Sequence, residues 1–181
     1  VPNPALGATT SRQLDASDQG FLASLPRDLN DCQPLDRTED VYGGAVPTAA
    51  VSCLASNLPG GQVYALRFAD EAARDVAFAD YTALETNTNG TCPNNDSAGP
   101  WTTPSGAVGG TASCYQVAIT PEDGSTPTED LGTHAVMAFT VTGQPVFLLA
   151  YDPWSSEVPP LVAWQSAHAS DFAATAPAAQ L

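Results

Sequence analysis

Four cysteines and two histidines are the side chains with the greatest potential for redox, metal or nucleophilic chemistry in this chain. The cysteines fall into two evenly spaced pairs, Cys32 with Cys53 and Cys92 with Cys114. None belongs to a Cys-x-x-Cys motif, and no histidine lies near a cysteine, whereas a zinc site needs such ligands at short spacing. The pattern therefore predicts disulfides in an oxidising compartment rather than a metal centre.

The histidines, His134 and His168, are the only residues of their type and lie far apart in the sequence. A general base needs a neighbouring nucleophile, and no Gly-x-Ser-x-Gly elbow is present. We therefore expect both to be structural or surface residues and predict that this chain is not an enzyme. A role for His168 as an acid sensor, close to Trp164, is the weaker alternative.

Acidic residues gather in one segment that has the oxygen ligands calcium prefers. They are Glu122, Asp123, Glu129 and Asp130. The segment lacks the Asp-x-Asp-x-Asp-Gly spacing of an EF-hand, so a solvated turn is the favoured interpretation. We predict no metal and no other cofactor.

The tryptophans, Trp101, Trp154 and Trp164, have two interpretations. They could line a ligand groove, although core packing with a hydrogen-bonded indole is the favoured interpretation. Trp154 lies in a turn, Asp152-Pro-Trp-Ser, and is the one expected to be exposed. An exposed tryptophan on an acidic protein would mark a contact surface.

The charge of the chain excludes several partners. It contains five arginines, no lysine and twenty acidic residues, giving a net charge of -15. Such a surface repels phosphate backbones and anionic headgroups, so nucleic acid and peripheral membrane binding are disfavoured. Part of the lysine deficit is typical of a GC-rich genome. No apolar run reaches the roughly 20 residues of a membrane span, so we expect membrane attachment only through a helix outside this chain.

The elements that must position these residues follow from periodicity and turn signals. Five strands are predicted at 49–55, 62–69, 110–119, 135–141 and 144–151. Helices are predicted after Asp15, from Asp70 to about Glu85, and from Pro159 or Pro160. Short turns between successive strands indicate antiparallel pairing. The predicted fold is α+β, with an antiparallel sheet of about five strands, helices packed on one face and two disulfides.

Four cysteines permit three disulfide connectivities. The sequential one is favoured because it closes the shortest loops. At about 22 residues a loop, each bond would stabilise the fold by roughly 3 kcal/mol. Each is expected to tie a loop to a strand.

The chain is expected to form one domain, at residues 14–172. Residues 1–13, rich in Pro, Gly and Thr, are predicted to be a linker, and residues 173–181 a flexible tail. The sequence opens at Val1 without a methionine, so we expect a fragment or a mature form of a longer protein. The predicted disulfides then imply a signal peptide or a transmembrane helix upstream of Val1.

Several motifs occur together in an order that resembles one family. The order is Leu25-Pro26 with Cys32, Ala50-Val51-Ser52-Cys53, Val63-Tyr64 to Phe68, Asp70 to Tyr81, Cys92, Trp101, Gly110 to Cys114-Tyr115, Met137 to Thr140, and Leu161 to Trp164. Over about residues 14–170 the chain resembles the extracellular sensor domains of actinobacterial receptor-type Ser/Thr protein kinases. It departs from them in having Phe139-Thr140 where a Trp-Thr step is usual, and a single Trp164 where a Trp-Trp pair is common.

The resemblance implies a non-catalytic sensor domain on the extracellular face of the cell membrane. Such a domain would activate its kinase by homodimerisation, by binding an unknown extracellular ligand or cell-envelope partner, or by both. The predicted interface is the apolar stretch that ends at the tryptophan turn, with Val146, Phe147, Tyr151 and Trp154. The alternative is a free-standing secreted protein or lipoprotein that binds a small ligand or a protein partner.

Overall fold

The computed structural model describes residues 12–37, 43–58, 60–83, 88–89, 92, 97–118 and 132–174. Its helices are α1 (Ala16–Leu22), α2 (Glu71–Thr82), α3 (Pro159–Ala167) and α4 (Ala169–Ala174). Its strands are β1 (Leu29–Pro34), β2 (Ala49–Ala55), β3 (Gln62–Arg67), β4 (Thr88–Asn89), β5 (Ser97–Thr102), β6 (Val108–Ala118), β7 (Thr133–Thr140) and β8 (Val146–Asp152).

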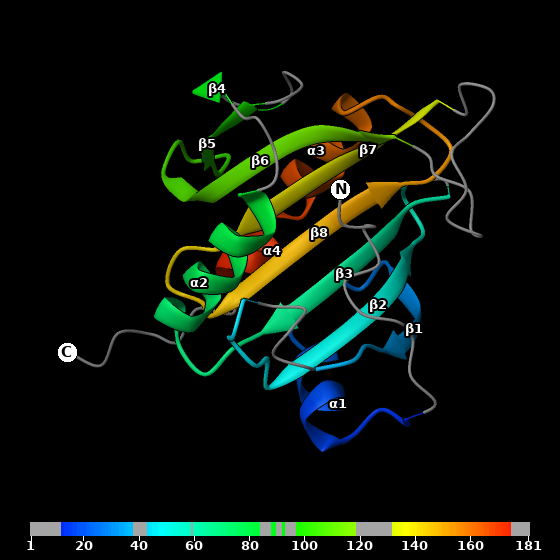
Figure 1. Ribbon diagram of the computed structural model, residues 1–181, viewed down its shortest axis with the longest axis vertical. Helices are drawn as coiled ribbons and strands as arrows, with labels where there is room; N and C mark the ends of the chain where they lie inside the picture. Colours follow the sequence, from blue (N-terminus) through cyan, green and yellow to red (C-terminus); the bar gives the residue numbers. More distant parts are fainter. Residues whose placement is uncertain are drawn as a thin grey trace.

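All the strands join one sheet in the order β1-β2-β3-β8-β7-β6-β5-β4 (Figure 1). Seven of them pair antiparallel, and the two-residue β4 adds a parallel strand beside β5. The α+β class and the antiparallel sheet are confirmed. The prediction of about five strands is wrong, because both ends of the sheet extend beyond the five predicted segments.

The missed strands, β1, β4 and β5, lie at the two ends of the sheet. β1 reads Leu-Asn-Asp-Cys-Gln-Pro and is half exposed, with a register shift between Asn30 and Gln33. β5 contains Gly99 and Pro100. Asn, Asp, Gly and Pro are depleted in strands and tolerated mainly at edges. Their presence therefore favoured a loop in the sequence, although the backbone pairs as a strand.

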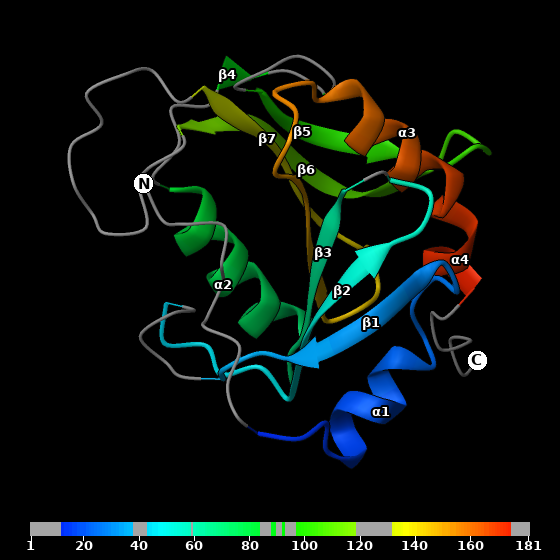
Figure 2. The same ribbon diagram turned by 90° about the vertical axis from the view of Figure 1, so that its right-hand side faces the viewer.

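Helices cover both faces of the sheet, so the prediction of helices on one face is wrong. Figure 2 shows α2 on one side and α1, α3 and α4 on the other. Two separate apolar cores result, one beneath α2 and one beneath the other helices. The reason lies in the central strands, since β8 is buried at nearly every position rather than at alternate ones. A strand apolar on both sides needs cover on both sides.

Local signals set the helix boundaries. Asp15 caps α1 in a reciprocal capping box with Asp18, and the Asp70 carboxylate accepts a hydrogen bond from the Ala73 N–H at the start of α2. α3 opens on Pro159, whose fixed φ suits the first turn and whose missing N–H is not needed there. These three predicted helix starts are confirmed.

The described residues between Arg12 and Ala174 surround one continuous sheet. Most of the predicted linker, residues 1–11, and the end of the predicted tail, residues 175–181, lie outside the described residues. The start of that tail, however, is helical, because α4 continues to Ala174. In the part of the chain that is described, no helix has both the length and the apolar character needed to cross a membrane.

Candidate functional site

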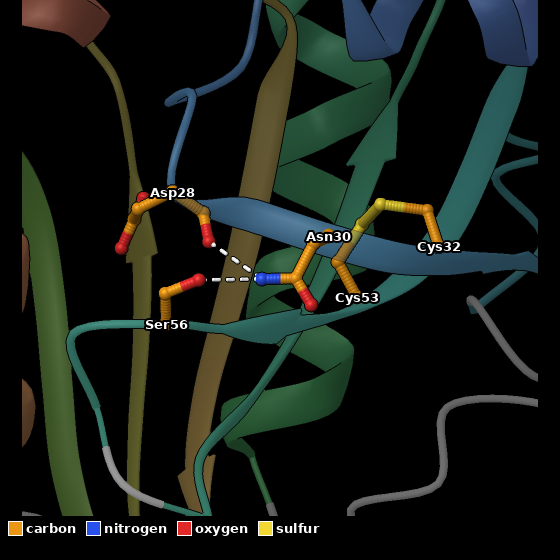
Figure 3. Close-up of a disulfide and its surroundings, with 5 residues drawn as sticks. All are labelled: Asp28, Asn30, Cys32, Cys53 and Ser56. Carbon is orange, nitrogen blue, oxygen red and sulfur yellow. Dashed lines mark hydrogen bonds between the residues drawn. A yellow bond between two sulfur atoms is a disulfide. The ribbon is translucent and has the colours of Figure 1, made fainter.

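The disulfides have the sequential pairing predicted for them. Cys32 bonds Cys53 and Cys92 bonds Cys114, with sequence separations of 21 and 22 residues. Figure 3 shows the first bond, beside which Asn30 donates hydrogen bonds from Nδ2 to the Asp28 carbonyl at 3.2 Å and to Ser56 Oγ at 2.6 Å. The bond connects two neighbouring strands, β1 and β2, and so differs from the predicted loop-to-strand tie.

The second disulfide does tie a residue outside the strands to the sheet, because Cys92 is bonded to Cys114 in β6. No cysteine is free. With all four cysteines in disulfides, the chain belongs to an oxidising extracellular or secreted setting. The cysteines therefore form scaffold and leave no thiol for catalysis.

The predicted interface residues separate into buried and exposed ones. Val146 and Phe147 are buried in β8, and Phe147 contacts Phe78 and Tyr81 beneath α2. They cannot contribute to an interface of the folded domain, so this part of the prediction is wrong. The reason is that β8 is a central strand rather than a surface hairpin. Tyr151 is half-buried, and Trp154 is 85% exposed.

The turn that carries Trp154 is held in place by its backbone. The Trp154 N–H donates to Asp152 Oδ1 at 2.9 Å, and the Pro153 carbonyl lies 2.9 Å from His134 Nδ1. The indole lies against Gly60, where an added Cβ would come within 2.5 Å of Trp154 Cδ1. The exposed aromatic side chain is thus presented from a fixed turn, as expected from its sequence.

The other histidine, His168, joins a partly buried polar network. His168 Nε2 lies 3.3 Å from Asp28 Oδ2, and His168 Nδ1 lies 2.9 Å from Asp171 Oδ2. The Trp164 indole N–H donates to the same Asp28 oxygen at 2.8 Å. The partners of the two histidines are thus two carboxylates at His168 and a backbone carbonyl at His134.

Trp101 is buried, with 7% of its surface exposed, and its indole N–H donates to the Thr140 carbonyl at 2.8 Å. The ring lies directly on the glycines of β6: a Cβ at Gly109 would come within 2.1 Å of Trp101 Cζ3. Bulkier residues there would displace the indole. The prediction of core packing with a hydrogen-bonded indole is confirmed for Trp101 and Trp164. Trp101 also forms the wall of a cavity.

Two cavities share Trp101 as a wall. The larger, of about 660 Å³, lies between the β5–β6 turn, the β7–β8 turn and α4. It is lined by Trp101, Thr103, Pro104, Ser105, Ala107, Val108, Gly109, Val141, Thr142 and Ser170. The smaller, of about 320 Å³, lies beside α3 and is lined by Cys92, Pro100, Trp101, Thr102, Ala112, Met137, Val162, Gln165 and Ser166. We call the pair the Trp101 cavities.

Neither of the Trp101 cavities is lined by an acidic, basic or histidine side chain among the described residues. Apolar walls with a few hydroxyls and one amide suit binding rather than acid–base chemistry. Gln165 is one of several lining residues that were not predicted as site residues from the sequence. Its position next to Trp164 on the buried side of α3 was the available signal.

Gln165 is only 2% exposed, and its Nε2 has no hydrogen-bond partner in the described part of the protein. A buried amide donor without an acceptor lowers stability. Unpaired buried groups are uncommon in native proteins, and one explanation is a functional role. Gln165 therefore carries a buried donor without a partner among the described residues, and it lines the smaller cavity.

The strongest electrostatic feature lies away from these cavities, at α1. Burial raises the pKa of Asp18, but hydrogen bonds from Arg12 and from the backbone N–H groups of Ala50 and Asp15 outweigh it and lower that pKa. The pKa of Asp15 is lowered to about 2, first by the Asp18 N–H and then by Arg37. The Asp18 carboxylate also accepts a hydrogen bond from the Ala50 N–H of β2, so these interactions fix α1 to the sheet.

Among the described residues, no group of three or more His, Cys, Asp or Glu is arranged to hold a metal ion. The acidic segment considered for calcium, with Glu122, Asp123, Glu129 and Asp130, lies outside the described residues. Comparison of the chain with protein families, with curated proteins and with solved structures found no match in any of the three.

Proposed function

We propose that this chain is a non-catalytic extracellular sensor domain of a transmembrane Ser/Thr protein kinase, located at the outer face of the cell membrane. The motif order that resembles such domains and the two disulfides support the proposal. The chain transmits a signal by homodimerisation, by ligand binding, or by both. The kinase and the membrane helix belong to parts of the protein outside this chain.

The observation that carries the proposal is the exposure of Trp154, at 85%, on a turn held by hydrogen bonds. Tryptophan is enriched among the residues that contribute most to protein interfaces, because it buries a large surface with few rotatable bonds. A symmetric contact places the same turn of both copies at the interface. Membrane attachment then brings the two kinases together by raising their effective concentration.

Sedimentation velocity on the purified domain at micromolar concentration tests the dimer. The wild-type domain should self-associate, and Trp154→Ala should be monomeric. Val76→Ala is the matched control, because Val76 is exposed on α2, on the opposite face of the sheet from α3. A wild-type domain that stays monomeric, or a Trp154→Ala variant that still dimerises, would contradict this interface.

A second candidate function is a free-standing secreted protein or lipoprotein that binds a small ligand, and the Trp101 cavities favour it. The gene sequence upstream of the Val1 codon separates the two. A kinase catalytic domain followed by a transmembrane helix supports the sensor domain. A signal peptide alone supports the free-standing protein.

A further inference from the structure

The cavity walls themselves restrict the chemistry of a ligand. The indole of Trp101 and the side chains of Val108 and Val141 give the larger cavity an apolar surface, with Val108 60% exposed at its mouth. Its volume of about 660 Å³ lies in the range of about 300–1,000 Å³ typical of small-molecule sites. An apolar chain or ring system would bury this surface and displace poorly bound water.

The absence of charged side chains from the described cavity walls restricts the chemistry of a ligand further. An anion placed here would lose its hydration without meeting a cationic side chain, since no arginine or histidine is among the lining residues. The net charge of the chain, -15, adds long-range repulsion. A cation would likewise find no carboxylate in the walls. The site therefore selects an uncharged molecule.

Gln165 adds a requirement for a hydrogen-bond acceptor on the ligand. Its buried Nε2 donor lacks a partner, and the residue lines the smaller cavity on the other side of Trp101. A carbonyl oxygen is the simplest acceptor that an uncharged ligand could present to it. Ser166, exposed at the rim of the same cavity, adds a hydroxyl.

We propose that the Trp101 cavities form a binding site for an uncharged ester-bearing amphiphile, whose apolar chain contacts Trp101 and Val108 and whose ester carbonyl accepts a hydrogen bond from Gln165. This inference rests on the proposed sensing function, for which it supplies the ligand class. Binding rather than turnover is expected, because the walls hold no general base or nucleophile pair to cleave the ester.

The chain contains a built-in reporter of occupancy. Met137 is its only methionine, is 1% exposed and lines the smaller cavity. In protein labelled with ¹³C-methyl methionine, glycerol monodecanoate should shift the Met137 methyl resonance saturably. Decanoate, which has the same chain with a carboxylate, should bind at least tenfold more weakly at neutral pH.

Two variants test the walls. Val108→Asp places a charge at the mouth of the larger cavity and should weaken binding of glycerol monodecanoate at least tenfold. Val76→Asp, the same change at an exposed valine on α2, should leave the affinity unchanged. Gln165→Leu removes the amide donor while keeping the side-chain volume similar, and should also weaken binding about tenfold, the usual effect of one lost hydrogen bond.

The site is overturned if glycerol monodecanoate produces no saturable shift at concentrations up to about 1 mM, the weak end of specific binding. It is equally overturned if Val108→Asp binds as well as Val76→Asp, or if decanoate binds as tightly as the ester. Sedimentation velocity on the same samples measures dimerisation independently of ligand binding. Loss of the Trp154-dependent dimer therefore counts against the proposed function, and loss of the methyl shift against this site.

Discussion

The two faces of the sheet are built on different principles. Beneath α2, aromatic rings pack directly: Phe147 contacts Phe78 and Tyr81, and Tyr81 contacts Tyr115. Beneath α1, α3 and α4 lie both disulfides and the smaller cavity, with its unpaired amide donor. The cavity beside α2, of about 330 Å³, is bordered by the charged side chains of Glu71, Arg74 and Asp75, whereas the opposite face combines both disulfides with cavities that have no charged side chain among their described lining residues. From this difference we expect the binding of an uncharged ligand, as proposed above, on the face that carries the disulfides.

The sharpest test of this comparison is Phe147→Ala on the α2 face. Removing a fully buried phenylalanine should lower the free energy of unfolding by about 3–5 kcal/mol, from lost burial plus a cavity. Trp154→Ala is the control, because an 85% exposed side chain should change stability by no more than about 0.5 kcal/mol. Urea unfolding followed by circular dichroism measures both. Equal effects at the two positions would contradict the burial described for them.

The two disulfides can be compared with each other on the face covered by α1, α3 and α4. Each double Cys→Ser variant should lose about 3 kcal/mol, because the two loops have nearly the same length. Only the variant lacking Cys92–Cys114 should also alter the Met137 methyl signal, since Cys92 lines the smaller cavity. A change of that signal on loss of Cys32–Cys53 would show that the cavity depends on the whole face.

Lowering the pH should weaken the ion pairs and hydrogen bonds that attach α1 to the sheet. The folded-state pKa of Asp15 is about 2 against an ordinary value of 3.8, so its stabilisation is complete above about pH 4 and is lost as the pH falls toward 2. The lowered pKa of Asp18 acts in the same direction. Urea midpoints measured between pH 5 and pH 2 should fall in the wild type and fall less in Asp15→Asn. Parallel curves for the two proteins would rule out this contribution.

The smallest change is expected for Gln165→Leu. Since its buried amide donor has no partner, replacing it with an apolar side chain should leave the free energy of unfolding unchanged or raise it by about 1 kcal/mol. Combined with weaker ligand binding, this result would separate binding from stability at one residue. A loss of more than about 1 kcal/mol would instead make Gln165 part of the scaffold.

Structural features that depend on residues close together in the sequence could be predicted, whereas features that depend on a distant strand could not. The capping residues Asp15 and Asp70 and the proline at Pro159 act within one helical turn, so the helix starts were predictable. The disulfide pairing followed from loop length. β1 escaped prediction because its polar residues are paired by a neighbouring strand, which no local pattern records.

The candidate site was predictable only in part. Trp154 was expected to be exposed because it follows a proline in a turn. The two roles of Trp101 depend on the contact with Gly109 and on the packing of α3 across the sheet. Phe147 was misjudged as surface because an apolar run has the same appearance whether one face of a strand is covered or both. Gln165 becomes informative only when its burial and missing partner are known.

The irregular first strand has a consequence for how copies of this domain meet. β1 is the last strand on its side of the sheet, and its backbone is interrupted by a register shift and by Asp31 at a φ of 48°. An edge broken in this way is a poor template for a strand from another molecule, which protects the protein from fibre-like growth by sheet extension. We therefore expect copies of this domain to meet through side chains, as in the proposed dimer, rather than by pairing of their β1 strands.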